Sequence, residues 1–308
     1  MAAGAEVIGA QINQVSEMQK NDLHVGIAQF ASVIGDVDQN IDKHLKWIEQ
    51  ARAKNVDLLV MPELSLTGHH GPEQLLTAAM KRSDPRLKKL ATAAGPMAVC
   101  VGFIEEGPAA QFYNASAMLQ NGRMVHIHRK INIPNYGKLE EGKHYASGRF
   151  VETHNLDEDW CTGLLICADA WNPALTNLAF LHGATLLVCP VSSGIEAVGV
   201  DFDNPSGWAT TMRFYSMMYG APSIMANRTG KEKDLTFWGG SRIIDPFGKE
   251  LAVAGTEEEL ITATLSYQMV RKARYLLPTV RDSNLSLVER ETSRLIQKIG
   301  VPDFVRED

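Results

Sequence analysis

The sequence predicts an α/β domain in which buried strands alternate with helices. Its first segments carry the main evidence: residues 23–30 and 56–63 are short apolar runs typical of buried strands. Between them, residues 38–55 place apolar side chains at helical spacing behind Asp38, a plausible cap. No linker-like or repeated segment divides the 308 residues, which are enough to bury a sizeable core. We therefore predict one domain with two sheets' worth of strands and helices between them.

The remaining elements follow in chain order. Helical material continues to about residue 94, and a strand is expected at 96–106. The Asn121-Gly122 pair predicts a hairpin across residues 112–130. Further strands are predicted at 160–167, 184–190, 221–228 and 258–267, helices at 174–182 and 207–220, a second hairpin at 239–252, and a helical tail after it.

Charge and hydropathy exclude several classes of partner. The formal net charge is −6 and there is no long basic run, so we expect neither nucleic acid nor an anionic membrane surface as a partner. No apolar stretch approaches the roughly 18 residues that a membrane span needs. The first residues lack the basic and apolar regions of a secretory signal, so we expect a cytoplasmic protein. Its three sequons are then chance matches, at Asn114, Asn227 and Asn284.

Three predicted strands end at side chains capable of acid–base or nucleophilic chemistry: Glu63, Lys130 and Cys167. Strand ends in α/β folds can converge on one crevice. A thiol with an ordinary pKa of about 8.5 is mostly protonated at neutral pH, so it needs a base to attack. A carboxylate can take the proton, and a lysine can stabilise an oxyanion. The set suggests acyl transfer through a thioester.

Three longer segments around these residues resemble the catalytic blocks of the nitrilase superfamily of carbon-nitrogen hydrolases. They are "MPELSLTG", "HRKINIPNYGKLEEGKHYASG" and "GLLICADAWNP", and the later "FWGGSRIIDPFGKELA" is similar to a hairpin of that family. The resemblance runs from about residue 23 to residue 280. It implies a four-layer α-β-β-α sandwich, usually paired into a dimer through the helical layer next to the nucleophile.

The resemblance also implies roles for individual residues. Glu63 matches the general base, Lys130 the lysine that stabilises the oxyanion, and Cys167 the nucleophile. The N–H group of Ala168 matches the second oxyanion donor. Glu141 matches a second glutamate that positions substrate and supports the lysine. An acidic residue is also tolerated at the position of its neighbour Glu140, so the choice between the two glutamates rests only on the register of the match.

The wall of the substrate pocket is less well defined by the sequence. Candidates for it are Tyr136, His144, Trp171, Ser192, Ser193 and Trp208. The pair His69-His70 is as consistent with a pocket wall as with an exposed loop. His126 and His128 alternate on one strand, but a zinc site needs three or four ligands and no third lies nearby, so we expect no metal and no organic cofactor.

The other three cysteines are expected to be structural rather than catalytic. Cys100 and Cys189 lie inside apolar runs, where a cysteine is usually structural. Cys161 matches no motif. Because no CxxC pair is present, we expect free thiols in a reducing compartment.

The resemblance leaves several reactions open. True nitrilases typically follow the nucleophile with Trp-Glu, whereas Ala168-Asp169 stands here. Glutamine-dependent NAD synthetases resemble the C-x-D-x-W pattern but carry a large further domain, and this sequence ends at Asp308. We therefore expect a stand-alone amidase that releases ammonia from a small amide or N-carbamoyl compound. A nitrilase, an acyltransferase and a catalytically silent partner remain alternatives.

Domain boundaries follow from the extent of the resemblance. Residues 1–22 are expected to form an N-terminal extension, and residues 23–280 the hydrolase domain. Residues 281–308 are expected to form a helical tail that packs at a subunit interface. The expected partners are a small-molecule substrate and further copies of the chain, in a homodimer or higher homo-oligomer.

Overall fold

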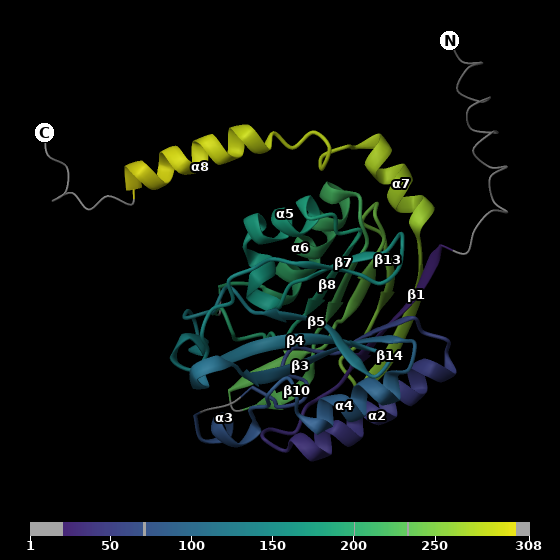
Figure 1. Cartoon of the computed structure of the whole chain (residues 1–308), viewed down its shortest axis with the longest axis vertical. Coiled ribbons are helices and arrows are strands. Elements are labelled where there is room, and N and C mark those ends of the chain that lie inside the picture. Colours follow the sequence, from purple (N-terminus) through teal and green to yellow (C-terminus); the bar gives the residue numbers. More distant parts are fainter. Residues whose placement is uncertain (1–20, 70–71, 200, 233, 300–308) are drawn as a thin grey trace, which may run out of the picture.

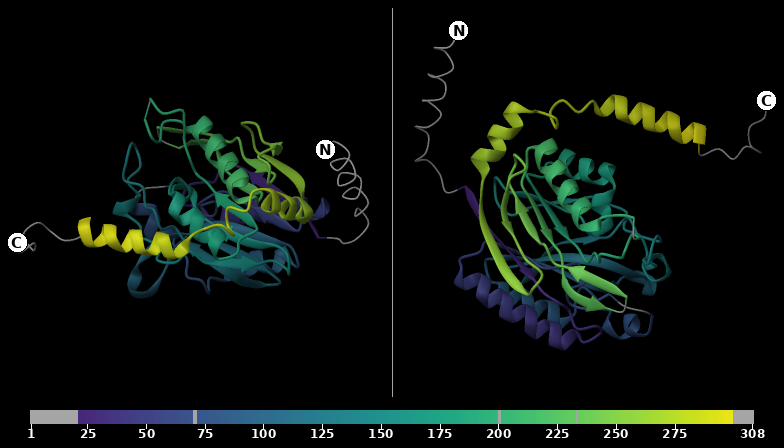
Figure 2. Two further views of the ribbon diagram at one scale, coloured as in Figure 1. Left: turned by 90° about the horizontal axis from the view of Figure 1, so that it is seen from above. Right: turned by 180° about the vertical axis from the view of Figure 1, so that it is seen from behind.

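Two six-stranded sheets pack face to face, and helices cover their outer faces (Figure 1, Figure 2). The computed structural model describes residues 21–69, 72–199, 201–232 and 234–299. The arrangement is the α-β-β-α sandwich that the resemblance implies. The expected extension at 1–22 lies outside the described residues except for its last two, and Asp22 already begins the first strand.

The first sheet has the order β14-β1-β2-β3-β4-β5. Strands β1, β2 and β3 run parallel to one another, and the other neighbouring pairs in the sheet are antiparallel. The strands are β1 (Asp22–Gln29), β2 (Leu58–Val60), β3 (Ala98–Glu106), β4 (Phe112–Gln120), β5 (Arg123–Arg129) and β14 (Glu259–Ser266). Its helices are α2 (Val37–Ala53), α3 (Pro72–Ala78) and α4 (Pro85–Ala94).

The second sheet has the order β13-β12-β9-β8-β7-β6, with β7, β8 and β9 parallel. Its strands are β6 (Thr153–Asn155), β7 (Cys161–Leu164), β8 (Leu186–Pro190), β9 (Ser223–Ala226), β12 (Arg242–Ile244) and β13 (Glu250–Val253). Helices α5 (Pro173–Leu181) and α6 (Asn204–Tyr219) cover its outer face. A separate hairpin pairs β10 (Thr229–Glu232) with β11 (Leu235–Trp238).

Consecutive residues of the central strands enter different hydrophobic layers. In β2, Leu58 lies between the two sheets, whereas Leu59 lies between the first sheet and its helices. In β8, Val188 lies between the sheets, and Leu187 packs with Trp208 of α6. Because both faces of these strands are buried, their sequences are continuously apolar rather than alternating.

Most predicted elements are present, with corrections at their ends. The strand predicted at 160–167 ends at Leu164, and Cys167 instead begins a 3-10 helix, η3 (Cys167–Trp171). Strand β2 is only three residues long. The cap of α2 is Asp36, whose side chain accepts a hydrogen bond from the N–H of Gln39, rather than Asp38. Strands β6, β10 and β11 are not predicted from the sequence, because their few residues become strands only through their partners.

After β14, the last strand of the first sheet, the chain contains α7 (Tyr267–Leu276) and α8 (Leu285–Ile299). Helix α8 extends away from the sandwich at one edge (Figure 1, Figure 2) and buries none of its residues. Leu295, Ile296 and Ile299 are all exposed on it. Its packing at a subunit interface stays a prediction. Within the described residues, every helix is too short or too polar to cross a membrane.

Candidate active site

Glu63 is held by a tight turn that follows β2. Leu64 has a φ of +50°, and its backbone lies directly against Gly102 of β3. A Cβ at Gly102 would come within 2.3 Å of the Leu64 nitrogen, so only glycine allows this approach. The N–H of Leu66 also donates to the carbonyl of Gly102 at 2.9 Å. The turn therefore fixes Glu63 in the interior, where its side chain is fully buried.

Lys130 is buried at the end of β5 and binds two carboxylates. Its Nζ donates to Glu63 Oε1 at 2.7 Å and to Glu141 Oε1 and Oε2 at 2.8 and 2.9 Å. Asn114 of β4 supports the group, since its carbonyl accepts from the Lys130 N–H and its Nδ2 donates to Glu63 Oε1, each at 2.8 Å. An ammonium between two carboxylates is a strong, geometrically defined arrangement.

The structure separates the two neighbouring glutamates. Glu141 begins η2 (Glu141–Lys143) and is buried beside Lys130. Glu140 is exposed and pairs with Lys143 at 2.7 Å. The choice of Glu141 over Glu140 from register therefore agrees with the contacts of Lys130.

Cys167 lies close enough to this cluster for its charges to act on the thiol. The residue has a φ of +44°, an unusual backbone conformation for a side chain other than glycine. Burial raises the pKa of the Cys167 thiol well above its ordinary value, and the charge of Glu63 raises it further, while Lys130 lowers it. The resting thiol is therefore protonated, and its attack on a carbonyl requires a base.

The neighbouring charges keep Lys130 and Glu141 ionised. Burial alone would lower the pKa of Lys130, but the charges of Glu141 and Glu63 hold it well above its ordinary value. Burial alone would raise the pKa of Glu141, but Lys130 and His69 outweigh it and lower it to about 2. The cluster thus contains a fixed positive charge where an oxyanion could form.

Asp169 connects the lysine segment to the cysteine segment. Its Oδ1 accepts hydrogen bonds from the N–H groups of Ile131 and Asn132 at 2.9 and 2.7 Å. Its Oδ2 accepts from His128 Nε2 at 2.8 Å and from the N–H of Ile166 at 3.1 Å. One buried carboxylate therefore sets the distance between the loop after Lys130 and the turn that carries Cys167.

His69 and Ser192 enclose the cluster on another side. Ser192 follows β8, and its N–H donates to Glu63 Oε2 at 2.7 Å. Its hydroxyl lies 2.9 Å from His69 Nδ1, and His69 Nε2 lies 3.2 Å from Glu141 Oε1. The sequence left the His69-His70 pair as either a pocket wall or an exposed loop. His69 lies against the cluster, and His70 lies outside the described residues.

The two histidines weighed and rejected as metal ligands from the sequence have other partners. His128 binds Asp169, and His126 stacks on His154 with ring centroids 5.7 Å apart. In the described part of the chain, Glu63, His69 and Glu141 offer three ligand atoms within 4.8 Å of one another. The ammonium of Lys130 already binds both of these carboxylates, and a cation placed among them would have to displace it.

The other predicted pocket residues differ in how they relate to the cluster. Tyr136 is 44 % exposed near Cys167. The partial burial of its hydroxyl, together with the negative charge that a Cys167 thiolate would carry, raises its pKa to about 12. Ser193 instead serves the fold, because its N–H donates to Asn227 and its hydroxyl accepts from Asn204.

Three of the aromatic candidates, Trp171, Trp208 and His144, contact other aromatic rings. Trp171 lies 4.7 Å from the buried Trp208, measured between ring centroids. The ring of His144 contacts Tyr145 edge-on, with the two centroids 6.4 Å apart. In these contacts Trp171 and His144 meet other aromatic rings rather than the charged groups of the cluster.

Three functional candidates were missed by the sequence analysis. Asn114 was dismissed as a chance sequon, yet it is fully buried against Glu63 and its Oδ1 has no hydrogen-bond partner among the described residues. Tyr145 is also buried with an unpartnered hydroxyl in that part of the chain, and it senses the charges of Glu141 and Lys130. Asp169 stood inside a quoted block without an assigned role. A polar residue in an apolar stretch was the available signal for Asn114.

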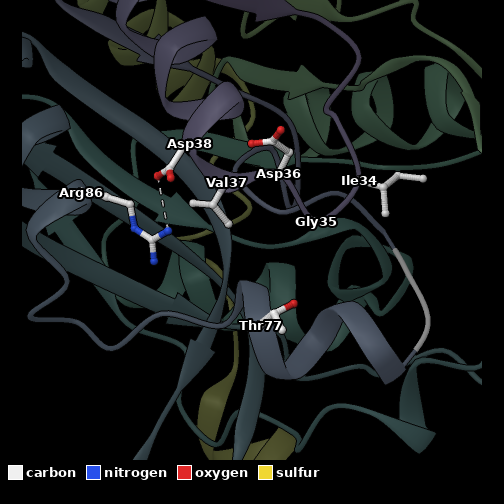
Figure 3. Close-up of a pocket in the computed structure, with 7 residues that line it drawn as sticks. All are labelled: Ile34, Gly35, Asp36, Val37, Asp38, Thr77 and Arg86. Carbon is white, nitrogen blue, oxygen red and sulfur yellow. Dashed lines mark ion pairs between the residues drawn. The ribbon is translucent and has the colours of Figure 1, made fainter.

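A separate surface pocket lies between the start of α2 and helices α3 and α4 (Figure 3). Asp38 and Arg86 face each other across part of it, with an N–O distance of 3.6 Å. None of the reactive side chains described above lines this pocket.

Comparisons with known proteins agree with the fold. A family model described as carbon-nitrogen hydrolase matches residues 24–275. The chain is 28% identical over 312 residues to a glutamine-dependent NAD(+) synthetase of Thermotoga maritima, covering 93% of this chain and 51% of that protein. It thus spans about half the length of the NAD(+) synthetases it matches.

Two further proteins match along most of their length. The chain is 25% identical over 286 residues to an N-carbamoylputrescine amidase of Solanum lycopersicum, covering 86% of this chain and 93% of that protein. Its structure is similar to a carbon-nitrogen hydrolase of Helicobacter pylori, with a TM-score of 0.77, 22% sequence identity, and coverage of 86% of this chain and 97% of the other.

Proposed function

This chain belongs to the carbon-nitrogen hydrolase family of the nitrilase superfamily, and on that premise we propose that it hydrolyses the C–N bond of a small amide or N-carbamoyl compound through a thioester on Cys167. The observation that carries the proposal is the buried Glu63–Lys130–Glu141 cluster beside a protonated thiol. A catalytically silent protein would have no need to bury a lysine together with two glutamates, because burying charges is costly.

In the proposed acylation, Glu63 accepts the thiol proton while the sulfur of Cys167 forms a bond to the carbonyl carbon of the substrate. The carbonyl oxygen becomes an oxyanion, which the Lys130 ammonium and the N–H of Ala168 stabilise. When the C–N bond breaks, Glu63 returns its proton to the departing nitrogen. For a primary amide the products of this step are ammonia and the thioester.

In the proposed deacylation, Glu63 takes a proton from water as the water oxygen attacks the thioester carbon. Lys130 stabilises the second oxyanion as it did the first. The C–S bond then breaks, the proton returns to the sulfur of Cys167, and a carboxylic acid leaves. Glu63 thus acts as base and then as acid in both half-reactions. General acid–base catalysis of this kind typically increases the rate about 10²–10⁴-fold.

The similar proteins support amides over nitriles as the substrate class. One is named for an N-carbamoyl amine, and the NAD(+) synthetases are named for dependence on glutamine, whose side chain ends in a primary amide. The side-chain amide of glutamine is therefore the second candidate substrate. The position of Ala168-Asp169 after the nucleophile, in place of Trp-Glu, points the same way.

The test is ammonia release across a panel of small amides, N-carbamoyl amines, glutamine and nitriles. We expect activity on at least one amide or N-carbamoyl compound, unchanged by a chelator and abolished in Cys167→Ala. The Cys161→Ala variant is the control, because that thiol lies apart from the cluster on β7. Turnover that survives in Cys167→Ala would refute the thioester, and transfer to hydroxylamine without net hydrolysis would indicate an acyltransferase.

A further inference from the structure

We propose that His69 is a positioning residue that closes a ring of hydrogen bonds around Lys130 and supplies the site with a second positive charge. The inference rests on the proposed role of the cluster in activating Cys167. It concerns a residue that the sequence left as either a pocket wall or an exposed loop.

The ring runs through five residues from separate parts of the chain. His69 Nε2 lies 3.2 Å from Glu141 Oε1, and that carboxylate accepts from Lys130 Nζ at 2.8 Å. Lys130 Nζ donates to Glu63 Oε1 at 2.7 Å, and Glu63 Oε2 accepts from the N–H of Ser192 at 2.7 Å. The Ser192 hydroxyl returns to His69 Nδ1 at 2.9 Å. Both ring nitrogens of His69 are therefore engaged, and both carboxylates are held from two sides.

The charges inside the ring show why an imidazolium suits this position. Without it, two carboxylates face a single ammonium, and the buried cluster carries an excess negative charge. An oxyanion formed on a substrate at Cys167 would add to that excess. A positive charge on His69 neutralises the resting cluster and so favours both thiolate and oxyanion.

The groups that face His69 include two carboxylates, which favour its charged form, and one ammonium, which opposes it. They are Glu141 of η2, Glu63 after β2 and Lys130 after β5, with the uncharged Ser192 after β8, while Cys167 of η3 faces Glu63 and Lys130. Burial alone would lower the pKa of His69. The hydrogen bond to Glu141, with the charges of Glu141 and Glu63, raises it above its ordinary value despite the opposing charge of Lys130.

The geometry separates the charge of His69 from its structural role. As an imidazolium it donates from both nitrogens, and the Ser192 hydroxyl accepts. As a neutral ring it can still donate from Nε2 to Glu141, while Nδ1 accepts from the same hydroxyl. The ring of contacts thus survives deprotonation and only the charge is lost. Activity that depends on the charge will fall with rising pH, and activity that depends on the contacts alone will not.

The experiment compares wild type, His69→Gln and Ser192→Ala, with His24→Gln as a matched control on β1 outside the site. The rate of Cys167 alkylation by iodoacetamide is measured from pH 5.5 to 9.5 by mass spectrometry of the Cys167 peptide, which requires no knowledge of the substrate. Loss of one nearby positive charge should slow alkylation of His69→Gln about tenfold near neutral pH. Ser192→Ala removes one contact of the ring but keeps the charge, so its rate should fall less than that of His69→Gln, and His24→Gln should react like wild type.

A second measurement uses the unchanged protein with ring-labelled histidines. The NMR signal of His69 should titrate above the ordinary midpoint of 6.5. A midpoint at or below that value overturns the proposal, as does a His69→Gln variant whose alkylation profile matches wild type. On an active substrate, His69→Gln should lower kcat rather than raise KM, and a change in KM alone would make His69 a substrate-binding residue instead. Loss of the thioester function would appear separately, as activity retained in Cys167→Ala.

Discussion

Replacing Lys130 by methionine should destabilise the protein in a way that depends on pH. Methionine has a similar length and fills the same space, but it carries no charge and donates no hydrogen bond. The change would leave Glu63 and Glu141 facing each other in the interior without the ammonium that binds both. Removal of one partner from a buried ion pair is far more costly than removal of an exposed one.

The loss of unfolding free energy at neutral pH should be about as large as the contribution of the buried ion pair. The pKa of Glu141 falls from 4.5 to about 2 in the folded protein, which corresponds to about 3 kcal/mol of stabilisation. Broken buried ion pairs typically cost about 3–5 kcal/mol. We therefore expect Lys130→Met to lose about 3 kcal/mol of unfolding free energy at pH 8.

The sign of the pH dependence follows from the two folded states. In wild type the depressed pKa of Glu141 stabilises the fold above pH 4.5, and this contribution is lost only as the pH falls toward 2. In Lys130→Met, two carboxylates share one site, so one of them should have a raised pKa. Its stabilising proton is lost as the pH rises. The gap between wild type and variant should therefore widen from pH 5 to pH 8.

Urea unfolding followed by circular dichroism at pH 5 and pH 8 measures both quantities. Lys143→Met is the matched control, since Lys143 pairs with Glu140 at the surface with both side chains exposed. That control should unfold like wild type at both pH values. The double variant Lys130→Met/Glu141→Gln should recover much of the loss at pH 8. A Lys130→Met protein as stable as wild type, or one with a pH-independent loss, would refute this account of the cluster.

Three further outcomes are expected. Glu63→Gln should slow Cys167 alkylation at neutral pH and reduce turnover about 10²–10⁴-fold, and a variant that reacts like wild type would remove Glu63 from the mechanism. Burial lowers the pKa of His44 to about 4, so its neutral form stabilises the fold above pH 6.5 and up to about 3 kcal/mol is lost as the pH falls to 4; His44→Leu should flatten that dependence in urea titrations, and an unchanged slope would contradict it. Light scattering at micromolar concentration should give a dimer or larger assembly, which Leu295→Glu on the exposed face of α8 should weaken; a monomeric wild type would argue against the predicted interface.

The sequence by itself determined the layers of the fold and the reactive residues. Continuous apolar runs at 56–63 and 184–190 could only be strands buried on both faces, because alternation is lost when neither face meets water. Glu63, Lys130 and Cys167 could be found because each stands where such a pattern gives way to polar residues. The hydrophobic pattern along a segment reports which of its residues are buried. The resemblance of three ordered blocks to those of the nitrilase superfamily implied the roles of the three residues.

The sequence was less informative about boundaries within the catalytic segments. The apolar run before Cys167 predicted a strand through that residue, whereas pairing ends at Leu164 and a 3-10 turn follows. Hydrophobicity reports that a residue is buried, but not whether a neighbouring strand pairs with it. The turn arises because Asp169 accepts the N–H of Ile166 and binds the loop after Lys130, a contact between distant segments.

Only the tertiary structure decided which polar residues form the site. Glu140 and Glu141 are adjacent in sequence and chemically identical, and the contact of Glu141 with Lys130 is what separates them. His69 was indistinguishable from a loop histidine until the fold brought it between Glu141 and Ser192, which is 123 residues away in the chain. Hydrogen bonds of this kind depend on angle and distance between segments that meet only after folding. Composition and periodicity cannot predict such contacts, because both describe a residue only through its neighbours along the chain.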